Sequence, residues 1–294
     1  MKDFKITGKT KCFAIIGDPV EQALSPIINN GGFNSVGADA VMVGLRVQKE
    51  NIEKALDGVR ALNISGLSVT MPLKSAVIPY LDDVEEKIKY LGAVNVVTNH
   101  DGILKGYNTD GDGFVLSMKA KGVDPRGKSM LVFGAGGAAK GICYAFLEAG
   151  VSSLTICNRS EENAKAVIDH LKQKFSTPIF YTSSDSPDFA DICCRSGIIL
   201  NATSMGMKGI PAPFIEAIPW DRLSKDTIIC DVVNKPVETE FIKTGRAHSM
   251  TCFAGDGMTL YQATIVYKLF METEDVPFDA MKAALEKHLE VING

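Results

Sequence analysis

The sequence has few of the residues from which metal sites and disulfide frameworks are built. Among 294 residues it has seven cysteines and four widely dispersed histidines: His100, His170, His248 and His288. Cys193 and Cys194 are adjacent, but no histidine or further cysteine stands near them at ligand spacing. The other cysteines stand in apolar runs: Cys12, Cys143, Cys157, Cys230 and Cys252. We therefore expect no metal site, and buried thiols in a reducing cytoplasm instead of disulfides.

An excess of positive charge and long apolar runs are also lacking. The chain has 31 Lys and Arg against 35 Asp and Glu, a net charge of −4, which argues against a nucleic acid or an anionic membrane as main partner. No apolar run approaches the roughly 20 residues of a membrane span, and the first residues lack the apolar core of a signal peptide. With 46% hydrophobic and 22% charged residues, the composition is typical of a globular cytoplasmic protein with room for two domains.

A glycine-rich segment is the most informative motif of the chain. It reads G-A-G-G-A-A at 134–139, follows the apolar run 130–133 and opens a helical pattern over 138–148. An apolar run at 153–157 completes a strand, turn, helix and strand, the context in which a G-x-G-x-x-G/A motif binds a dinucleotide. The first glycine permits the tight turn, and the second lets the backbone approach a pyrophosphate at the helix N-terminus. A glycine turn that binds nothing is the alternative interpretation.

The chain divides near residue 110, and its first part has the pattern of a small α/β domain. Short apolar runs predict strands at 12–16, 41–47, 67–70, 94–98 and 103–107. An apolar face over 52–62 predicts a helix after the second strand. His100-Asp101-Gly102 predicts a hairpin turn before the last strand.

The second part has the pattern of a doubly wound sheet. A helix is expected at 114–121, before the glycine loop. Further strands are expected at 178–181, 197–200, 227–232 and 250–253. With the two strands around the glycine loop these make about six, and their alternation with helices favours a parallel sheet. Helical patterns at 259–271 and 278–291 follow.

Three polar side chains stand at the ends of predicted strands in the first part. Lys74 follows the third strand, because Pro72 ends the hydrogen-bonded ladder and sends the chain into a turn. Asn95 stands at the beginning of the next strand, and Asp110 follows the last one. A desolvated lysine oriented by a carboxylate can transfer protons near neutral pH. Taken singly, Lys74 also fits a solvated turn and Asp110 a helix N-cap, so spacing alone leaves both interpretations open.

A series of motifs in a fixed order resembles the shikimate dehydrogenase family. The resemblance runs from residue 13 to about 270. The matching segments are 17–26, 68–74 (the family's N-V-T-x-P-x-K), 92–95 (G-A-V-N), 106–110 (G-x-N-T-D), the glycine loop, 158–160 (N-R-[ST]), 201–207 (N-A-T-S-x-G-M) and 255–262 (G-x-x-M-L-x-x-Q).

The resemblance implies a fold and a reaction. It implies an N-terminal α/β substrate domain, a Rossmann-type doubly wound parallel-sheet domain, and C-terminal helices that return to the first domain. The substrate-binding catalytic domain is then expected at 1–110 and 256–294, and the NAD(P)-binding domain at 111–255. The implied reaction is reversible hydride transfer between a nicotinamide and a ring hydroxyl or ketone of shikimate, 3-dehydroshikimate or a close relative. The protein is expected to be a monomer or a homodimer.

The resemblance also assigns roles to residues. Lys74 and Asp110 are the implied catalytic pair, with Lys74 passing the proton of the reacting hydroxyl and Asp110 holding that hydroxyl in place. The implied partner is a small ring carboxylate, and its expected binding residues are Ser25, Ser68, Thr70, Asn95 and Gln262. Ser25 is the residue expected to bind the carboxylate.

The implied cofactor is NADP, with NAD usable. Its expected binding residues are Gly134, Ala135, Gly136, Gly137, Ala138, Asn158, Arg159, Ser160, Thr203, Met207 and Gly255. Arg159 stands where an arginine accommodates the 2′-phosphate of NADP, and Ser160 adds a hydroxyl. Glu161 follows, and it is either a residue that binds a ribose hydroxyl and repels the phosphate, or a first-turn acid favoured by the helix dipole. Lys165 is the nearest cation beyond it.

Three positions depart from the family pattern. Ala23 replaces the first serine of a pair, Ser68 replaces the asparagine of N-V-T, and Asn234 stands where a tyrosine often contacts the substrate carboxylate. Each lost hydrogen bond to a charged group costs about 1.5–3 kcal/mol, which is enough to change specificity. Two alternatives to a shikimate dehydrogenase therefore stay open. One is a dehydrogenase of quinate or another cyclic polyol acid that uses NAD, and the other is a non-catalytic metabolite sensor on the same scaffold.

Overall fold

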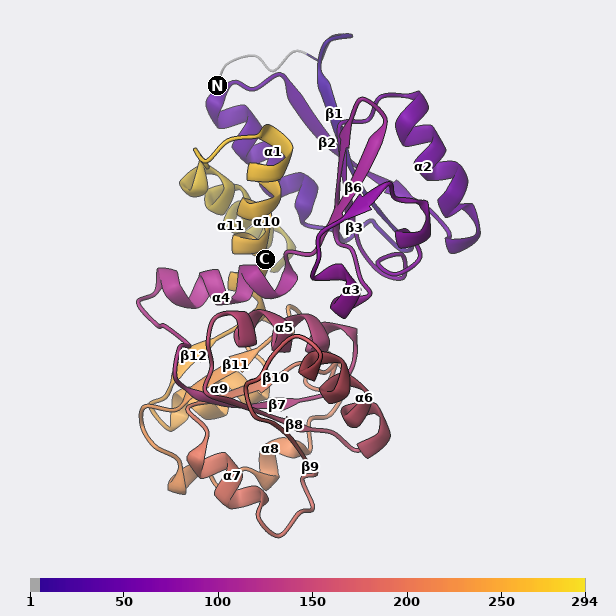
Figure 1. The fold of residues 1–294 in the computed structure, drawn as a ribbon. Coiled ribbons are helices and arrows are strands. Elements are labelled where there is room, and N and C mark those ends of the chain that lie inside the picture. The colour runs from indigo at the N-terminus through magenta and orange to yellow at the C-terminus, as the bar shows by residue number, and fades with distance from the viewer. Residues whose placement is uncertain (1–5, 294) are drawn as a thin grey trace. The chain divides into compact units, whose positions relative to one another are not determined.

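The computed structural model describes residues 6–293, which form two compact units (Figure 1). The first unit comprises the chain up to Thr109 and again from Gln262 onward, and the second comprises Asp110 to Tyr261. Within the described residues, no helix combines the length and the apolar character needed to cross a bilayer. The same residues contain no group of three or more His, Cys, Asp and Glu side chains that could hold a metal ion.

The first unit is built on a six-stranded mixed sheet in the order β2-β1-β3-β5-β6-β4. Its strands are β1 Lys11–Gly17, β2 Ala40–Arg46, β3 Gly66–Val69, β4 Asp83–Val84, β5 Val96–His100 and β6 Ile103–Tyr107. Strand β1 pairs in parallel with β2 and β3, whereas β5 is antiparallel to both β3 and β6. The predicted hairpin turn joins β5 to β6, with Asp101 at φ 53° and Gly102 at φ 89°.

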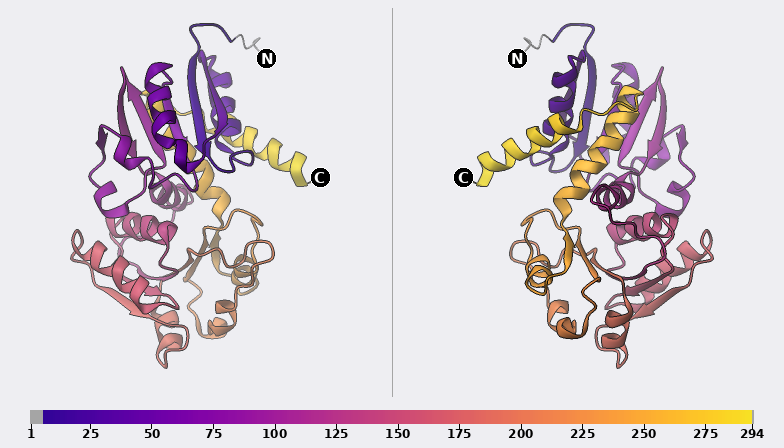
Figure 2. Two further views of the ribbon diagram at one scale, coloured as in Figure 1. Left: turned by 90° about the vertical axis from the view of Figure 1, so that its right-hand side faces the viewer. Right: turned by 90° about the vertical axis from the view of Figure 1, so that its left-hand side faces the viewer.

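Helices cover this sheet, and the first of them along the chain is among those with no counterpart in the sequence-based expectations. The helical elements are α1 Ser25–Val36, η1 Lys49–Asn51, α2 Ile52–Ala61, η2 Ile78–Tyr80, α3 Ile88–Leu91, the later part of α10 Gly255–Met271, and α11 Phe278–Asn293. Helix α1 was not predicted, because glycines and asparagines interrupt its apolar pattern. A Cβ on Gly31 would lie 2.4 Å from the Cβ of Ala284, so this glycine permits the close approach of α1 and α11 (Figure 2).

The C-terminal helices return to the first unit, as predicted. The ring of Phe270 on α10 stacks on Phe13 of β1, with 4.5 Å between centroids. A Cβ on Gly66 would lie 2.8 Å from the same Phe270 ring, so a glycine on β3 makes room for it. The other face of the sheet packs Leu67 and Val69 into an apolar core that includes Leu56 of α2.

The second unit contains a six-stranded sheet in the order β12-β11-β10-β7-β8-β9, and every pairing in it is parallel. Its strands are β7 Ser129–Phe133, β8 Ser153–Cys157, β9 Ile179–Thr182, β10 Ile198–Asn201, β11 Ile228–Asp231 and β12 Thr251–Phe253. Its helical elements are α4 Asp110–Ala120, α5 Gly137–Glu148, α6 Glu161–Lys172, α7 Phe189–Arg195, α8 Phe214–Ala217, η3 Trp220–Arg222, α9 Glu240–Ala247 and the start of α10. The strand order starts at β7 and runs outward in both directions, which confirms the doubly wound prediction.

Helix α4 begins at Asp110, earlier than the helix expected at 114–121. Asp110 is therefore a first-turn residue, and the interpretation of Asp110 as an N-cap ahead of the helix was wrong. Glycines within the first turn explain the error, because Gly111 and Gly113 weaken a helical pattern in the sequence. A Cβ on Gly111 would lie 2.5 Å from the carbonyl oxygen of Gly141, so close packing of α4 on α5 requires this glycine.

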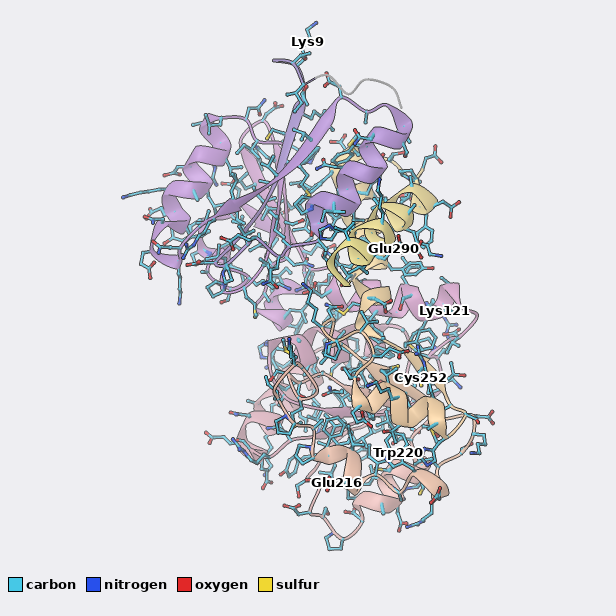
Figure 3. All side chains as sticks on the ribbon, turned by 180° about the vertical axis from the view of Figure 1, so that it is seen from behind. Lys9, Lys121, Glu216, Trp220, Cys252 and Glu290 are labelled. Carbon is cyan, nitrogen blue, oxygen red and sulfur yellow. The ribbon has the colours of Figure 1, made fainter. Side chains whose placement is uncertain are left out.

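The core of the second unit contains a chain of aromatic rings. Phe133 of β7 lies against Phe214 with 4.3 Å between ring centroids, and Phe214 lies against Phe241 at 5.2 Å. Trp220, labelled in Figure 3, lies 5.9 Å from Phe241 and 5.4 Å from the ring of His248. Such contacts bury large apolar areas and fix the helices that follow β10 and β11.

All seven cysteines are free thiols, and the prediction that they are buried holds only in part. Cys143, Cys157, Cys193 and Cys230 are buried, whereas Cys12, Cys194 and Cys252 are half-buried. Desolvation raises the pKa of Cys143, Cys157 and Cys193 to about 12, so these thiols are protonated at neutral pH. Cys252 remains partly open because β12 is an edge strand.

Candidate active site

In the first unit, three of the predicted site residues lie at the end of the sheet where β1 and β3 end: Thr70, Lys74 and Asn95. Thr70 directly follows β3, and its N–H donates to the carbonyl of Ile16 on β1 over 2.9 Å. A Cβ on Gly17, the last residue of β1, would lie 2.3 Å from Cγ2 of Thr70. Only glycine at this position therefore lets Thr70 stand at the end of β1.

Main-chain hydrogen bonds bring Lys74 and Asn95 to the same end of the sheet. Lys74 is half-buried in the turn after β3, and its carbonyl oxygen accepts from the N–H of Val94 over 2.7 Å. The carbonyl of Asn95 in turn accepts from the N–H of Val69 over 2.8 Å. The turn that carries the ammonium group and the strand that carries the amide thus have a fixed relative position.

Thr109 is the centre of a buried polar cluster, and sequence analysis gave it no role. Asn95 and Thr109 are 3% and 2% exposed, so their polar atoms depend on one another. The N–H of Thr109 donates to Oδ1 of Asn95 over 2.9 Å, and Nδ2 of Asn95 donates to Oγ1 of Thr109 over 3.1 Å. Nε2 of Gln262 donates to the same hydroxyl over 3.0 Å. Thr109 thus joins two predicted substrate residues and directly precedes Asp110.

The two predicted serines have different surroundings. Ser25 is the half-buried first residue of α1, and its carbonyl accepts from Nδ2 of Asn29 over 2.9 Å. Ser68 lies inside β3 and is 4% exposed. Its hydroxyl is closed to solvent and finds no hydrogen-bond partner within the part of the chain that the structure describes.

Of the two implied catalytic residues, Lys74 belongs to the first unit and Asp110 to the second.

The glycine loop has the features that a dinucleotide requires. Gly134 has φ 108°, and a Cβ there would lie 2.7 Å from Cγ2 of Thr203. Gly136 is the N-cap of α5, and no side chain among the described residues caps this helix. A Cβ on Gly136 or Gly137 would meet no described atom within 4 Å, and both glycines and Ala138 are exposed. The N–H groups of the helix N-terminus are therefore open to a phosphate, and the residues fit a dinucleotide.

The turn after β8 presents Arg159, and a lysine on the following helix pairs with the nearest acid. Nδ2 of Asn158 donates to the carbonyl of Ser160 over 2.8 Å, and Oγ of Ser160 caps α6 by accepting from the N–H of Asn163 over 3.2 Å. Arg159, between them, is exposed. Glu161 lies in the first turn of α6 and pairs with Lys165 over 2.7 Å, so Lys165 offsets part of its charge. Lys165 is correspondingly engaged with that carboxylate.

The ends of β10 and β11 hold a buried polar pair that sequence analysis missed. Asn201 and Asp231 are the last residues of these strands, they pair in register, and both are 0% exposed. Nδ2 of Asn201 donates to Oδ1 of Asp231 over 3.0 Å. Burial raises the pKa of Asp231 to about 6, although hydrogen bonds from Thr239, Val233 and Asn201 favour the carboxylate. A polar residue at the end of an apolar strand was the signal that could have revealed both.

The remaining predicted cofactor residues follow the carboxyl ends of strands in this same sheet. Met207, in the loop after β10, is 43% exposed. Gly255 starts α10, where a Cβ would lie 2.7 Å from the carbonyl of Val232 and 2.7 Å from Oδ1 of Asn234. The hydroxyl of Thr259 donates to Oδ1 of Asn234 over 3.2 Å. Asn234 is thus held against the first turn of α10.

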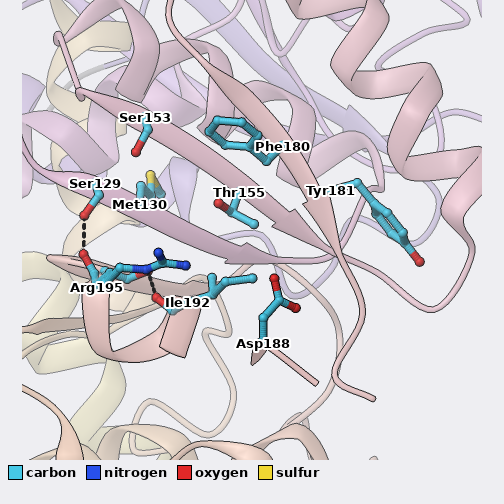
Figure 4. A pocket seen from close by; sticks show the side chains of 10 residues that line it. Ser129, Met130, Ser153, Thr155, Phe180, Tyr181, Asp188, Ile192 and Arg195 are labelled. Atoms are coloured by element: carbon cyan, nitrogen blue, oxygen red, sulfur yellow. Dashed lines mark hydrogen bonds between the residues drawn. The ribbon is translucent and has the colours of Figure 1, made fainter. Parts of the chain in front are cut away.

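A pocket elsewhere in the second unit does not coincide with any of these residues (Figure 4). It has a volume of about 400 Å³ and lies beside α7, where β7 and β8 begin. Its lining residues are Ser129, Met130, Ser153, Thr155, Phe180, Tyr181, Asp188, Ile192, Arg195 and Ser196. The glycine loop follows the opposite end of β7, so this pocket is not the dinucleotide site.

Two family models match the chain. The "Shikimate dehydrogenase substrate binding domain" matches residues 15–97, and "Shikimate / quinate 5-dehydrogenase" matches residues 117–240. A relative from Caldanaerobacter subterraneus subsp. tengcongensis, named shikimate dehydrogenase (NADP(+)), is 38% identical over 267 residues, which cover 90% of this chain and 93% of the relative. The chain belongs to the shikimate dehydrogenase family.

Solved structures of other proteins resemble this shikimate dehydrogenase family member over nearly its whole length. Shikimate 5-dehydrogenase from Listeria monocytogenes, in complex with shikimate and NAD, gives a TM-score of 0.88 at 32% identity and covers 96% of this chain and 98% of its own. Ligand-free 5-ketofructose reductase of a Gluconobacter strain gives 0.86 at 28% identity, with coverage of 96% and 99%. The two-unit fold is therefore shared by enzymes whose names give different substrates.

Proposed function

We propose that this chain is an NADP-dependent shikimate dehydrogenase that interconverts shikimate and 3-dehydroshikimate. One observation carries the proposal. Thr70, Lys74 and Asn95 stand at one end of the first unit's sheet, and Asn95 is hydrogen-bonded to Thr109, which directly precedes Asp110. These residue types in this order are those expected to hold a polyhydroxylated ring and to move one proton.

Lys74 and Asp110 carry the proton transfer in this proposal. Lys74 takes the proton of the reacting hydroxyl during oxidation and returns a proton to the ketone oxygen during reduction. Asp110 accepts a hydrogen bond from that hydroxyl and fixes its orientation toward Lys74. The turn after β3 supports the part of Lys74, because the carbonyl of Lys74 accepts from the N–H of Val94 and so holds the residue at this end of the sheet.

Polar side chains around this pair bind the ring. We assign Ser25 to the carboxylate and Thr70, Asn95 and Gln262 to ring hydroxyls. Asn95 and Gln262 share the hydroxyl of Thr109, so both amides are oriented before substrate arrives. This preorganisation reduces the loss of side-chain entropy on binding.

The glycine loop and the turn after β8 hold the cofactor in this proposal. The bound nicotinamide supplies the site that accepts or donates the hydride. The N–H groups at the start of α5 bind the pyrophosphate, and Arg159 with Ser160 binds the 2′-phosphate of NADP. Since Lys165 offsets the charge of Glu161, the acid beside Arg159 repels that phosphate less than its charge alone suggests. NAD is then a weaker second cofactor.

Quinate or another cyclic polyol acid is the second candidate substrate. The observation that favours it is the closed surroundings of Ser68, whose hydroxyl is shielded from solvent and so is poorly placed to replace the family's asparagine. Asn234 also replaces a tyrosine, and its Oδ1 is engaged with Thr259. Both changes alter contacts expected for shikimate.

A substrate panel tests the proposal. Shikimate and quinate are each offered with NADP and with NAD, and the absorbance of the reduced nicotinamide is followed. We expect shikimate with NADP to give the highest kcat/KM. A higher kcat/KM for quinate would establish the second candidate. A chain that reduces neither cofactor with any ring acid would be a sensor rather than an enzyme.

We further propose a cytoplasmic location. Seven free thiols, four of them buried, support a reducing compartment. The protein is expected to be a monomer or a homodimer, and sedimentation equilibrium distinguishes these two states.

A further inference from the structure

One buried carboxylate, that of Asp231, connects several segments at the carboxyl ends of the strands in the second sheet. Oδ1 of Asp231 accepts from Nδ2 of Asn201 over 3.0 Å and from the N–H of Val233 over 3.0 Å. Its Oδ2 accepts from the hydroxyl of Thr239 over 2.7 Å. Thr239 is 1% exposed, and its Oγ1 also accepts from the N–H of Ile242 over 3.3 Å as the cap of α9. A single side chain thus joins the ends of two strands and the start of a helix.

Asn201 extends this connection into the loop that contains Thr203. Oδ1 of Asn201 accepts from the N–H of Thr203 over 3.1 Å and from its hydroxyl over 2.6 Å. Nδ2 of Asn201 donates to the carbonyl of Met205 over 2.9 Å, and the N–H of Met205 donates back to Oγ1 of Thr203 over 3.0 Å. Each of these bonds constrains the backbone between β10 and Met207. The loop therefore depends on the orientation of the Asn201 amide. Asp231 holds that orientation by accepting a hydrogen bond from Nδ2 of Asn201.

The same loop touches the glycine turn. A Cβ on Gly134 would lie 2.7 Å from Cγ2 of Thr203, so the two segments are in contact. A Cβ on Gly206, at φ 92°, would lie 3.6 Å from Cβ of Thr239. On the other side, the loop after β11 lies against Gly255 through the carbonyls of Val232 and Val233. The network around Asp231 therefore adjoins predicted cofactor residues from three separate segments.

Stability alone does not account for a charge at this position. Asp231 is fully buried and has no cationic partner among the groups that bond it, all of which are neutral donors. Burial raises its pKa to about 6, which means that the ionised form costs more solvation energy in the folded chain than in the unfolded chain. The groups that bond Asp231 belong to the strand end, the loop and the helix start beside the cofactor site, so its carboxylate acts on the loops of that site.

We propose that Asp231 is a positioning residue for the nicotinamide end of the cofactor, acting through Asn201 and Thr203 on one side and through Thr239 on the other. The proposal rests on the proposed dehydrogenase function. Neither Asp231 nor Thr239 touches substrate or cofactor in it. They hold the loop 202–207, so that Thr203 and Met207 meet the nicotinamide in one arrangement.

Three variants and one matched control test the proposal. Thr239→Val keeps the shape of the side chain but removes the donor to Asp231, and Thr239→Ser restores a hydroxyl. Asp231→Asn keeps the shape and removes the charge. Thr227→Val is the control, because Thr227 is 1% exposed and its hydroxyl donates to the carbonyl of Ser196 over 3.3 Å, just before the opposite end of β11.

We expect Thr239→Val to lower kcat/KM for NADP about tenfold, through both kcat and the KM for NADP, while the KM for shikimate stays within about twofold. Thr239→Ser restores most of this loss, and Asp231→Asn reproduces it. Thr227→Val lowers the melting temperature without changing the kinetic constants. Equal kinetic losses in Thr239→Val and Thr227→Val would overturn the proposal, as would native kinetics in both Thr239→Val and Asp231→Asn.

Hydrogen–deuterium exchange without cofactor gives a readout that is independent of activity. In Thr239→Val and Asp231→Asn, the amides of Thr203 and Met205 are expected to exchange at least about tenfold faster than in the unaltered chain, and those in Thr227→Val at the original rate. Unchanged exchange in all variants would overturn the proposal.

Direct titration of the unaltered chain with NADP separates failure of the positioning role from failure of the proposed function. If it binds NADP and the variants behave normally, only the positioning role fails, whereas an unaltered chain that binds no dinucleotide overturns the proposed function and this role together.

Discussion

Gln262 donates its side-chain amide to the hydroxyl of Thr109 over 3.0 Å, although 153 positions separate the two residues in the chain. Thr109 is the last residue of the first segment of its unit, and Gln262 is the first residue of the returning segment. The hydrogen bond therefore closes the first unit at the point where the chain leaves it and where it comes back. The same hydroxyl also accepts from Asn95, so this closure is part of the candidate substrate site.

Replacing Thr109 with Val is expected to weaken both the fold and substrate binding. The amides of Asn95 and Gln262 each lose an acceptor, and an unsatisfied buried polar group costs about 1–3 kcal/mol. We expect a drop of this size in the free energy of unfolding and an increase of about tenfold or more in the KM for shikimate, with the KM for NADP little changed. Thr109→Ser keeps the hydroxyl and is the control. A native KM for shikimate in Thr109→Val would contradict the assigned roles of both amides.

Replacing Lys74 with Met should remove the proton carrier while keeping most of the side chain's length. Steady-state assays are expected to show turnover reduced by about 10²–10⁴. NADP affinity should stay near its original value, because Lys74 belongs to the first unit and the glycine loop to the second. Lys54→Met, at an exposed position on α2, is the matched control. Near-native turnover in Lys74→Met would show that another group moves the proton.

Replacing Arg159 with Ala should discriminate between the two cofactors. The guanidinium is expected to pair with the 2′-phosphate, which NAD lacks, so the KM for NADP should rise at least about tenfold and that for NAD much less. Arg195→Ala serves as the control, since Arg195 is exposed and lies at the opposite end of the sheet, just before β10. Equal effects of Arg159→Ala on both cofactors would mean that this side chain does not recognise the phosphate.

Asp231 should make stability depend on pH in an unusual direction for a carboxyl group. Its pKa in the folded chain is about 6, above the ordinary value of 3.8, so folding favours its protonated form. Its stabilising contribution is complete below about pH 4 and is lost as the pH rises through about 6, a change on the order of 3 kcal/mol. Asp231→Asn cannot titrate, so its free energy of unfolding relative to the unaltered chain should rise over this window.

The single tryptophan makes this pH effect measurable. Trp220 lies in the second unit, so its fluorescence reports the unfolding of the unit that contains Asp231. Urea unfolding curves at about pH 4, 5, 6 and 7 give the difference between Asp231→Asn and the unaltered chain. A difference that stays constant from about pH 4 to 7 would show that Asp231 titrates at its ordinary pKa.

The sequence predicted the parts of the fold that depend on local pattern. Strand β7, the glycine loop, helix α5 and strand β8 lie where short apolar runs and glycines indicated, because each is specified by its own residues and its neighbours. The residues that carry the family resemblance, such as Lys74 and Asn95, stand in contiguous motifs and could be named for the same reason. Family resemblance then gave the return of the C-terminal helices, which local pattern does not contain.

Features that depend on long-range contacts were not predictable in this way. Helix α1 was missed because Gly31 is required by Ala284, which is distant in sequence. Thr109 and Asp231 were missed as centres of polar clusters, since their partners are Gln262 in one case and Asn201 and Thr239 in the other. Nothing in the residues beside them shows that these side chains are buried. Only the folded chain shows which polar groups depend on them.

The close approach at Gly111 sets a limit on how this enzyme can be altered by mutation. Any side chain at position 111 would meet the carbonyl of Gly141, so α4 would have to move away from α5. Asp110 is the preceding residue, and its carboxylate would move with the helix. A position with no chemical function is therefore as intolerant of replacement as the proposed catalytic residue beside it. Libraries designed to change the substrate of this enzyme should keep Gly111 fixed and vary the exposed position Asn234 instead.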